Sequence, residues 1–110
     1  MQVDIAVIDY GMGNLRSVSK AIEHVAPAAS VVVTSDPDII ASAGRVVFPG
    51  QGAAPDCMRE IDARGLRDVI IAAAQSKPFL GICMGMQILF EHSEEGDTDC
   101  LGILPGTVQR

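Results

Sequence analysis

The chain has 110 residues, of which 48% are hydrophobic and 20% charged, a composition that suits one folded domain. Its formal net charge is −6 and it has no cluster of Lys or Arg, so we expect neither nucleic acid nor an anionic membrane surface as a partner. The apolar runs are too short for a membrane span, and MQVDIAVIDY lacks the basic start and cleavage site of a signal peptide, which predicts a cytoplasmic protein.

The first half of the chain predicts three strands and two helices. IAVIDY (5–10) is a nearly continuous apolar run, as a buried parallel strand requires. After the glycines of GMGN, apolar residues recur at helical spacing, and Asn14 is the expected N-cap. The β-branched SVVVTS (30–35) predicts a second strand, and Asp36 with the proline after it opens a short helix. RVVFPG (45–50) predicts a third strand that runs into the loop PGQGA.

The second half continues the alternation. Two helical pieces are expected within residues 55–75, a fourth strand at FLGI (79–82) and a helix at MGMQILFEH (84–92). LGILPGTVQR (101–110) predicts a turn into another strand. This order indicates an α/β fold with an open, mostly parallel sheet and helices on both faces. In such sheets functional sites form beyond the carboxyl ends of the strands, where three glycine-bearing loops are expected: GMGN, PGQG and GICMG.

The spacing of the cysteines and histidines argues against a metal site. The three cysteines are odd in number and far apart, so neither a disulfide framework nor a C-x-x-C site is expected. His24 and His92 are each isolated from any cysteine at ligand spacing. GMGN does not open a dinucleotide fingerprint, because Arg16 stands where the third glycine is needed. We therefore expect no metal and no cofactor.

Cys83 lies between Gly81 and Gly85 at the predicted strand-to-helix turn, and G-x-C-x-G has the layout of a nucleophile elbow with cysteine in place of serine. Side chains at the two glycine positions would collide in so tight a turn. The N-terminus of the following helix favours the thiolate, which is the reactive species. A lone cysteine is more often a small buried hydrophobe, and we keep that interpretation for Cys57 and Cys100.

A thiolate that attacks an acyl carbon also needs hydrogen-bond donors for the oxygen that becomes negatively charged. The backbone N–H of Met84, which follows the nucleophile, is the first candidate for this oxyanion hole. The N–H of Gln51 is the second, because Gly50 and Gly52 allow that backbone to approach closely and reorient.

The segment PFLGICMGMQILFEHSEEG resembles the nucleophile region of class I (triad-type) glutamine amidotransferases, whose pattern is G-x-C-x-G-x-Q. IDYGMGNLRSV, VVFPGQGA and LGILPGTVQR are similar to one branch of that family, the glutaminase subunits of imidazole glycerol phosphate synthase in histidine biosynthesis. The resemblance implies a flavodoxin-like fold, with residues 1–110 as the N-terminal part of a single amidotransferase domain. It also implies that glutamine is hydrolysed through a Cys83 thioester and that the ammonia passes to a cyclase subunit, the expected partner in a heterodimer.

The resemblance also implies roles for other residues. The Gln87 amide would hold the carboxylate or amino end of the substrate, and the Glu95 carboxylate would bind its α-ammonium group. Asn14 and Arg16, in the first loop, would face the cyclase. Each also has an ordinary structural interpretation: Gln87 as a solvated helix residue, Glu95 as part of a helix-end charge pair, and Asn14 as a plain N-cap.

Two departures from the family pattern have consequences. The family triad includes a histidine and a glutamate from a region after the elbow, and neither histidine of this chain can replace that histidine. On the expected elbow helix, His92 lies more than about 10 Å from Cys83 along the axis. We therefore expect the chain to be part of a longer enzyme, and residues 1–110 alone not to turn over glutamine. The second departure is Gln51, where the family has a small apolar residue in P-G-V-G; the flanking Gly50 and Gly52 match the family's oxyanion strand.

Three alternatives stay open. Amidotransferases of the anthranilate, guanylate and pyridoxal phosphate pathways share the elbow, although IDYGMGNLRSV favours histidine biosynthesis. Cysteine hydrolases of the dienelactone-hydrolase type and small redox sensors also have cysteine elbows, but Gln87 and PGQG argue against them. The third alternative is a non-catalytic docking half-domain.

Overall fold

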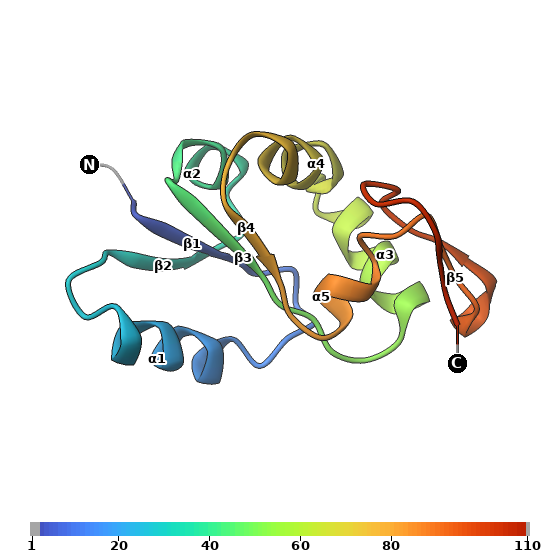
Figure 1. The fold of residues 1–110 in the computed structure, drawn as a ribbon, viewed down its shortest axis with the longest axis horizontal. Helices are drawn as coiled ribbons and strands as arrows, with labels where there is room; N and C mark the ends of the chain where they lie inside the picture. Colours follow the sequence, from blue (N-terminus) through green and yellow to red (C-terminus); the bar gives the residue numbers. More distant parts are fainter. Residues whose placement is uncertain (1–2, 110) are drawn as a thin grey trace.

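The computed structural model describes residues 3–109, and its centre is a parallel four-stranded sheet (Figure 1). The strand order is β2-β1-β3-β4, and all neighbouring pairs are parallel. The strands are β1 (Ile5–Ile8), β2 (Val31–Thr34), β3 (Arg45–Phe48) and β4 (Phe79–Gly81). The four strands expected from the sequence are thus confirmed, each slightly shorter than expected, and the residues beyond their carboxyl ends belong to the loops of the candidate site.

Helices lie on both faces of this sheet, as expected for the α/β fold. Figure 1 shows α1 on one face and α2 with α4 on the other. The helices are α1 (Leu15–Val25), α2 (Pro37–Ser42), α3 (Ala54–Ala63), α4 (Arg67–Ser76) and α5 (Met84–Gln87). Both expected N-caps are confirmed: the Asn14 side chain accepts from the N–H of Ser17, and Asp36 accepts from the N–H of Asp38.

The main core lies between the sheet and the helices α2, α3 and α4. Ile8, Val46 and Phe48 project from the strands into this layer and are at most 1% exposed. Fully buried residues of the helices and their connections pack against them, namely Ile40, Ile61, Leu66 and Ile70. This layer therefore fixes the carboxyl ends of β1 and β3, from which two of the three glycine-bearing loops extend.

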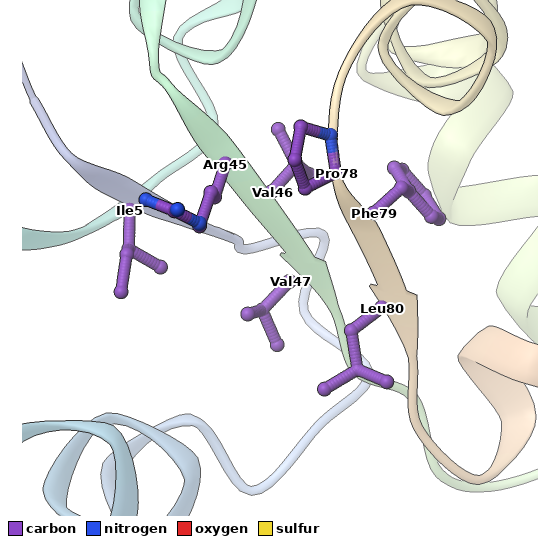
Figure 2. A pocket seen from close by; sticks show the side chains of 7 residues that line it. All are labelled: Ile5, Arg45, Val46, Val47, Pro78, Phe79 and Leu80. Atoms are coloured by element: carbon purple, nitrogen blue, oxygen red, sulfur yellow. The ribbon is translucent and has the colours of Figure 1, made fainter. Parts of the chain in front are cut away.

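The α1 face is more open. No residue of α1 is buried, and Val25 and Leu80 are 78% and 58% exposed. A groove of about 400 Å³ separates α1 from Leu80 and Ile82. A second cavity of about 250 Å³ lies over β1, β3 and β4, and Figure 2 shows Ile5, Val47 and Leu80 directed to the α1 side of the sheet. Cys83 lines neither cavity.

The residues after α5 form a second, three-stranded sheet in the order β6-β5-β7, beside the main sheet (Figure 1). Its strands are β5 (His92–Ser93), β6 (Thr98–Asp99) and β7 (Thr107–Val108), with a 3₁₀ turn at Glu95–Asp97. The expected late strand is confirmed as β7, which pairs in parallel with β5.

The expectation of a helix over residues 84–92 is wrong beyond Gln87. The carbonyls of Ile88, Leu89 and Phe90 accept hydrogen bonds from N–H groups of residues 101–104. Carbonyls engaged with a distant segment cannot support the next helical turn, because a continuing helix needs them for residues four positions later. Apolar spacing in 84–92 therefore did not predict where the helix ends. Within the described part of the chain, no helix is both long and apolar enough to span a membrane.

Candidate functional site

Cys83 occupies the turn between β4 and α5 in a backbone conformation that non-glycine residues rarely adopt. Its φ is 56° and its ψ is −122°, and the cysteine is exposed. Positive φ at a residue with a Cβ is strained and persists only where the surroundings enforce it. The sulfur is therefore held outside the packed interior, as the elbow interpretation expects.

The two flanking glycines are required by close backbone contacts. A Cβ at Gly81 would lie 2.8 Å from the Cα of Met86, and a Cβ at Gly85 would collide with the carbonyl oxygen of Phe48. The N–H of Ile82 also donates to the Phe48 carbonyl at 3.0 Å. The end of β3 thus packs directly on the elbow at Gly85, and the backbone of the elbow itself leaves no room for a side chain at Gly81.

The loop Pro49–Gly52, called the oxyanion loop below, lies against the elbow. A Cβ at Gly50 would lie 2.7 Å from the backbone nitrogen of Gly85. The N–H of Met84 donates to the Gly50 carbonyl at 3.2 Å, and the N–H of Gln51 donates to the Met12 carbonyl at 2.8 Å. The Gly50–Gln51 peptide therefore directs its carbonyl toward the elbow. Both N–H groups expected in the oxyanion hole are engaged by backbone carbonyls in this conformation.

Two buried side chains that the sequence did not identify as part of the site contact the oxyanion loop. The Tyr10 hydroxyl donates to the Pro49 carbonyl at 2.8 Å, and the Cys57 thiol donates to the Gln51 carbonyl with Sγ at 3.6 Å. Burial raises the pKa of Tyr10 far above its usual range and, as the largest cause, also raises the pKa of Cys57. Both groups therefore stay protonated and act as donors at neutral pH. The sequence feature that could have pointed to Tyr10 is that it is the only tyrosine of the chain and directly precedes GMGN.

Cys57 and Cys100 are buried and Cys83 is exposed. Burial is also the largest cause that raises the pKa of Cys100. The interpretation of Cys57 and Cys100 as packed cysteines agrees with this burial, although Cys57 lies next to the oxyanion loop.

The two residues assigned to substrate binding have different surroundings. Gln87 is half-buried at the end of α5, and its side chain makes no hydrogen bond to residues 3–109. The Glu95 carboxylate accepts from the N–H of Ala54 at 2.7 Å, at the first residue of α3. The N-cap residue of that helix, Ala53, has no side chain to do this. Glu95 therefore caps α3 from 41 residues away.

The two residues assigned to the partner interface lie at the start of α1. Asn14 caps the helix, so its structural interpretation holds, and the side chain is exposed. Arg16 is exposed in the first turn. The structure leaves both accessible to a partner.

Neither histidine is placed to act as the base of Cys83. His92 lies in β5, with Nε2 at 3.0 Å from Asp97 and Nδ1 at 3.0 Å from Asp99. Both ring nitrogens are thus engaged by carboxylates, and this excludes His92 as the base. The expected place of His92 on the elbow helix was wrong, because α5 ends at Gln87. His24 is exposed in the last turn of α1. Among the described residues, no group of three or more metal-ligating side chains could hold a metal ion.

The contacts of His92 predict a raised pKa, chiefly through the hydrogen bond to Asp99 and then through Asp97. A raised folded-state pKa contributes stability that is fully present below the unfolded pKa and is lost as pH rises through the folded pKa. An NMR titration of the His92 ring should show this pKa, and Asp99→Asn should lower it. The control Asp68→Asn, at an exposed carboxylate of α4, should leave it unchanged; equal effects of both variants would contradict the assignment.

Comparison with known proteins agrees with this geometry. Residues 6–102 match the family described as glutamine amidotransferase class-I. The chain is 86% identical over 110 residues to the imidazole glycerol phosphate synthase subunit HisH of Thiobacillus denitrificans, covering 100% of this chain and 48% of that protein. The subunit of the same name from Aromatoleum aromaticum is 73% identical over 107 residues, covering 97% of this chain and 50% of that protein. The one from Dechloromonas aromatica is 69% identical over 106 residues, covering 96% of this chain and 49% of that protein.

The chain therefore spans about half the length of the curated relatives it matches. The family match includes the first loop, the oxyanion loop and the elbow, and it extends over most of the chain. The chain belongs to the class I glutamine amidotransferase family.

Proposed function

We propose that this chain provides the nucleophile-bearing part of a cytoplasmic glutaminase subunit of imidazole glycerol phosphate synthase, which passes ammonia to a cyclase subunit in histidine biosynthesis. The observation that carries the proposal is the exposed, strained Cys83 in a tight turn whose next residues pack against a glycine loop at the carboxyl end of a parallel sheet. The 86% identity to a HisH subunit supports this branch of the family over amidotransferases of other pathways.

In the proposed reaction, the Cys83 thiolate attacks the side-chain amide carbon of glutamine. The tetrahedral intermediate collapses as the C–N bond breaks, and the protonated nitrogen leaves as ammonia, which leaves a thioester on Cys83. Water then attacks the thioester and releases glutamate and the thiol. The proton transfers need a general base, which family resemblance assigns to a histidine oriented by a glutamate. Both histidines of this chain lie outside that role, so the proposed base comes from another part of the enzyme.

The oxyanion of the intermediate requires a rearrangement of the oxyanion loop. With the Gly50 carbonyl directed at the elbow, an oxyanion beside Cys83 would meet an acceptor instead of a donor. A half-turn of the Gly50–Gln51 peptide would exchange the two groups. It would break the bonds of Gln51 N–H to Met12 and of Met84 N–H to Gly50, and so bring both expected donors to the intermediate. Gly50 has no Cβ to hinder this rotation.

The charge and position of four further residues support their proposed roles in substrate binding and in contact with the cyclase. The Glu95 carboxylate is hydrogen-bonded to Ala54, the first residue of α3, which follows Gly52 by two positions in the chain. There the carboxylate can receive the α-ammonium group of glutamine. Gln87 lies one helical turn after Cys83 with its amide unused by other described residues. Asn14 and Arg16, exposed at the carboxyl edge of the sheet, form the proposed contact with the cyclase.

The proposal is tested by measuring ammonia release from glutamine with the full-length polypeptide and its cyclase, beside the 110-residue chain alone. The complex should release ammonia and incorporate it into the cyclase product. The 110-residue chain should release none above the buffer rate, because no histidine reaches Cys83. Turnover by the short chain at a rate comparable to the complex would contradict the proposed origin of the base. Stimulation by a synthase of another pathway, but not by the cyclase, would contradict the proposed branch.

A further inference from the structure

Tyr10 and Cys57 are two buried polar side chains that each donate a hydrogen bond to the oxyanion loop. Tyr10 is 1% exposed and Cys57 is 0% exposed. The Tyr10 hydroxyl donates to the Pro49 carbonyl, and the Cys57 thiol donates to the Gln51 carbonyl.

The two accepting carbonyls belong to the peptides on either side of Gly50–Gln51. The Pro49 carbonyl is part of the Pro49–Gly50 peptide, and the Gln51 carbonyl is part of the Gln51–Gly52 peptide. Within residues 3–109, the hydrogen bonds of the central peptide are all to backbone groups, those of Met12 and Met84. Buried side-chain donors thus hydrogen-bond to the two flanking peptides, and neither donor is hydrogen-bonded to the peptide that must rotate.

Hydrogen bonds to the flanking peptides would limit how far the rotation spreads along the loop. If the flanking peptides were free, rotation of the central peptide would spread along the loop, and the N–H of Gln51 would reach the oxyanion in a range of orientations. An oxyanion hole is effective only when its donors are preorganised, because a donor that must be ordered during the reaction loses most of its advantage. Side-chain bonds that persist in both orientations would confine the rotation to one peptide.

We propose that Tyr10 and Cys57 are positioning residues of the oxyanion loop, whose paired donors hold the flanking peptides so that only Gly50–Gln51 turns. The inference rests on the proposed glutaminase function. Neither side chain contacts the substrate, so their loss affects formation of the tetrahedral intermediate and leaves glutamine binding unchanged.

The test uses the full-length protein in complex with its cyclase, three single variants, the double variant of Tyr10→Phe with Cys57→Ala, and one control. Tyr10→Phe keeps the ring beside Phe48 and removes the hydroxyl, Cys57→Ala removes the thiol, and Cys57→Ser keeps a donor. Cys100→Ala is the matched control, because Cys100 is also buried and its thiol donates to a backbone carbonyl, that of Thr98, at 3.6 Å.

The expected results separate positioning from general stability. Tyr10→Phe and Cys57→Ala should each lower the kcat for glutamine by about five- to tenfold, the factor set by one buried hydrogen bond, with KM unchanged. The double variant should lose less than the product of the two single losses, because both groups hold the same loop. Cys57→Ser should recover most of the rate, and Cys100→Ala should match the wild type.

Alkylation of Cys83 by iodoacetamide gives a readout that does not involve the oxyanion. That reaction forms a C–S bond and expels iodide without a tetrahedral oxyanion, so its rate should be equal in all variants. An equal loss of kcat in Cys100→Ala, or wild-type kcat in both Tyr10→Phe and Cys57→Ala, would overturn the inference. Cys57→Ser as slow as Cys57→Ala would also overturn it. A wild-type complex without glutaminase activity would instead show that the proposed function itself is wrong.

Discussion

Cys83→Ala is expected to abolish glutamine-dependent turnover in the full-length complex, with kcat lower by at least about 10⁴-fold. The reason is that the proposed thioester cannot form without the sulfur, and the structure offers no second exposed thiol, since Cys57 and Cys100 are buried. The cyclase reaction supplied with free ammonia should proceed at the wild-type rate, because that substrate bypasses the elbow. Ammonia release from glutamine by itself gives the direct measurement.

A companion variant tests the strained backbone separately from the chemistry. Cys83→Gly should be as inactive as Cys83→Ala, but it should be more stable by about 1 kcal/mol, because glycine adopts a φ of 56° without steric conflict. Urea unfolding of the two variants measures this difference. Equal stability would show that the conformation at residue 83 stores no strain, and glutaminase activity in either variant would remove Cys83 from the mechanism.

The second large effect is expected at Gly85. In Gly85→Ala the new methyl group would collide with the Phe48 carbonyl oxygen, so either the elbow or the end of β3 must move. We expect the free energy of unfolding to fall by about 3 kcal/mol. We also expect kcat to fall by about 100-fold, because a displacement of the nucleophile of about 1 Å has an effect of that order.

Gly13→Ala is the matched control for this variant. A Cβ at Gly13 would lie 3.7 Å from Leu15 and Pro49, at ordinary van der Waals distance, although Gly13 also belongs to a loop at the carboxyl end of a strand. Its stability and kcat should stay near the wild type. If Gly85→Ala behaved like Gly13→Ala, the tight contact between β3 and the elbow would not be a requirement of the site.

The main sheet was predictable because its signals are local. Val31 to Thr34 form a β-branched run, Asn14 and Asp36 are N-caps within their own turns, and the four expected strands pair in one parallel sheet. The end of α5 was not predictable in this way, since the bonds that stop the helix come from residues 101–104. Of the two-residue strands of the second sheet, β7 was expected after the turn in LGILPGTVQR, whereas β5 and β6 are too short for an alternation pattern to identify them.

The candidate site likewise has a part that local sequence predicts and a part that depends on distant residues. The elbow at Cys83 was identified from glycine spacing, which encodes a purely local steric requirement. The orientation of the Gly50–Gln51 peptide depends on the Met12 carbonyl, and the contact of Tyr10 with Pro49 joins residues 39 positions apart. The capping of α3 by Glu95 likewise joins residues 41 positions apart. Such pairings are set by the topology of the sheet, so no spacing in the sequence reveals them.

The most direct test of the central claim is peptide mapping of the full-length complex after reaction with an electrophilic glutamine analogue, such as a chloroketone. We expect covalent modification at Cys83 alone, with none at the buried Cys57 and Cys100, and protection when glutamine is added first. Equal modification of all three cysteines in the folded protein, or modification of Cys83 that glutamine does not prevent, would contradict the assignment of Cys83 as the glutaminase nucleophile.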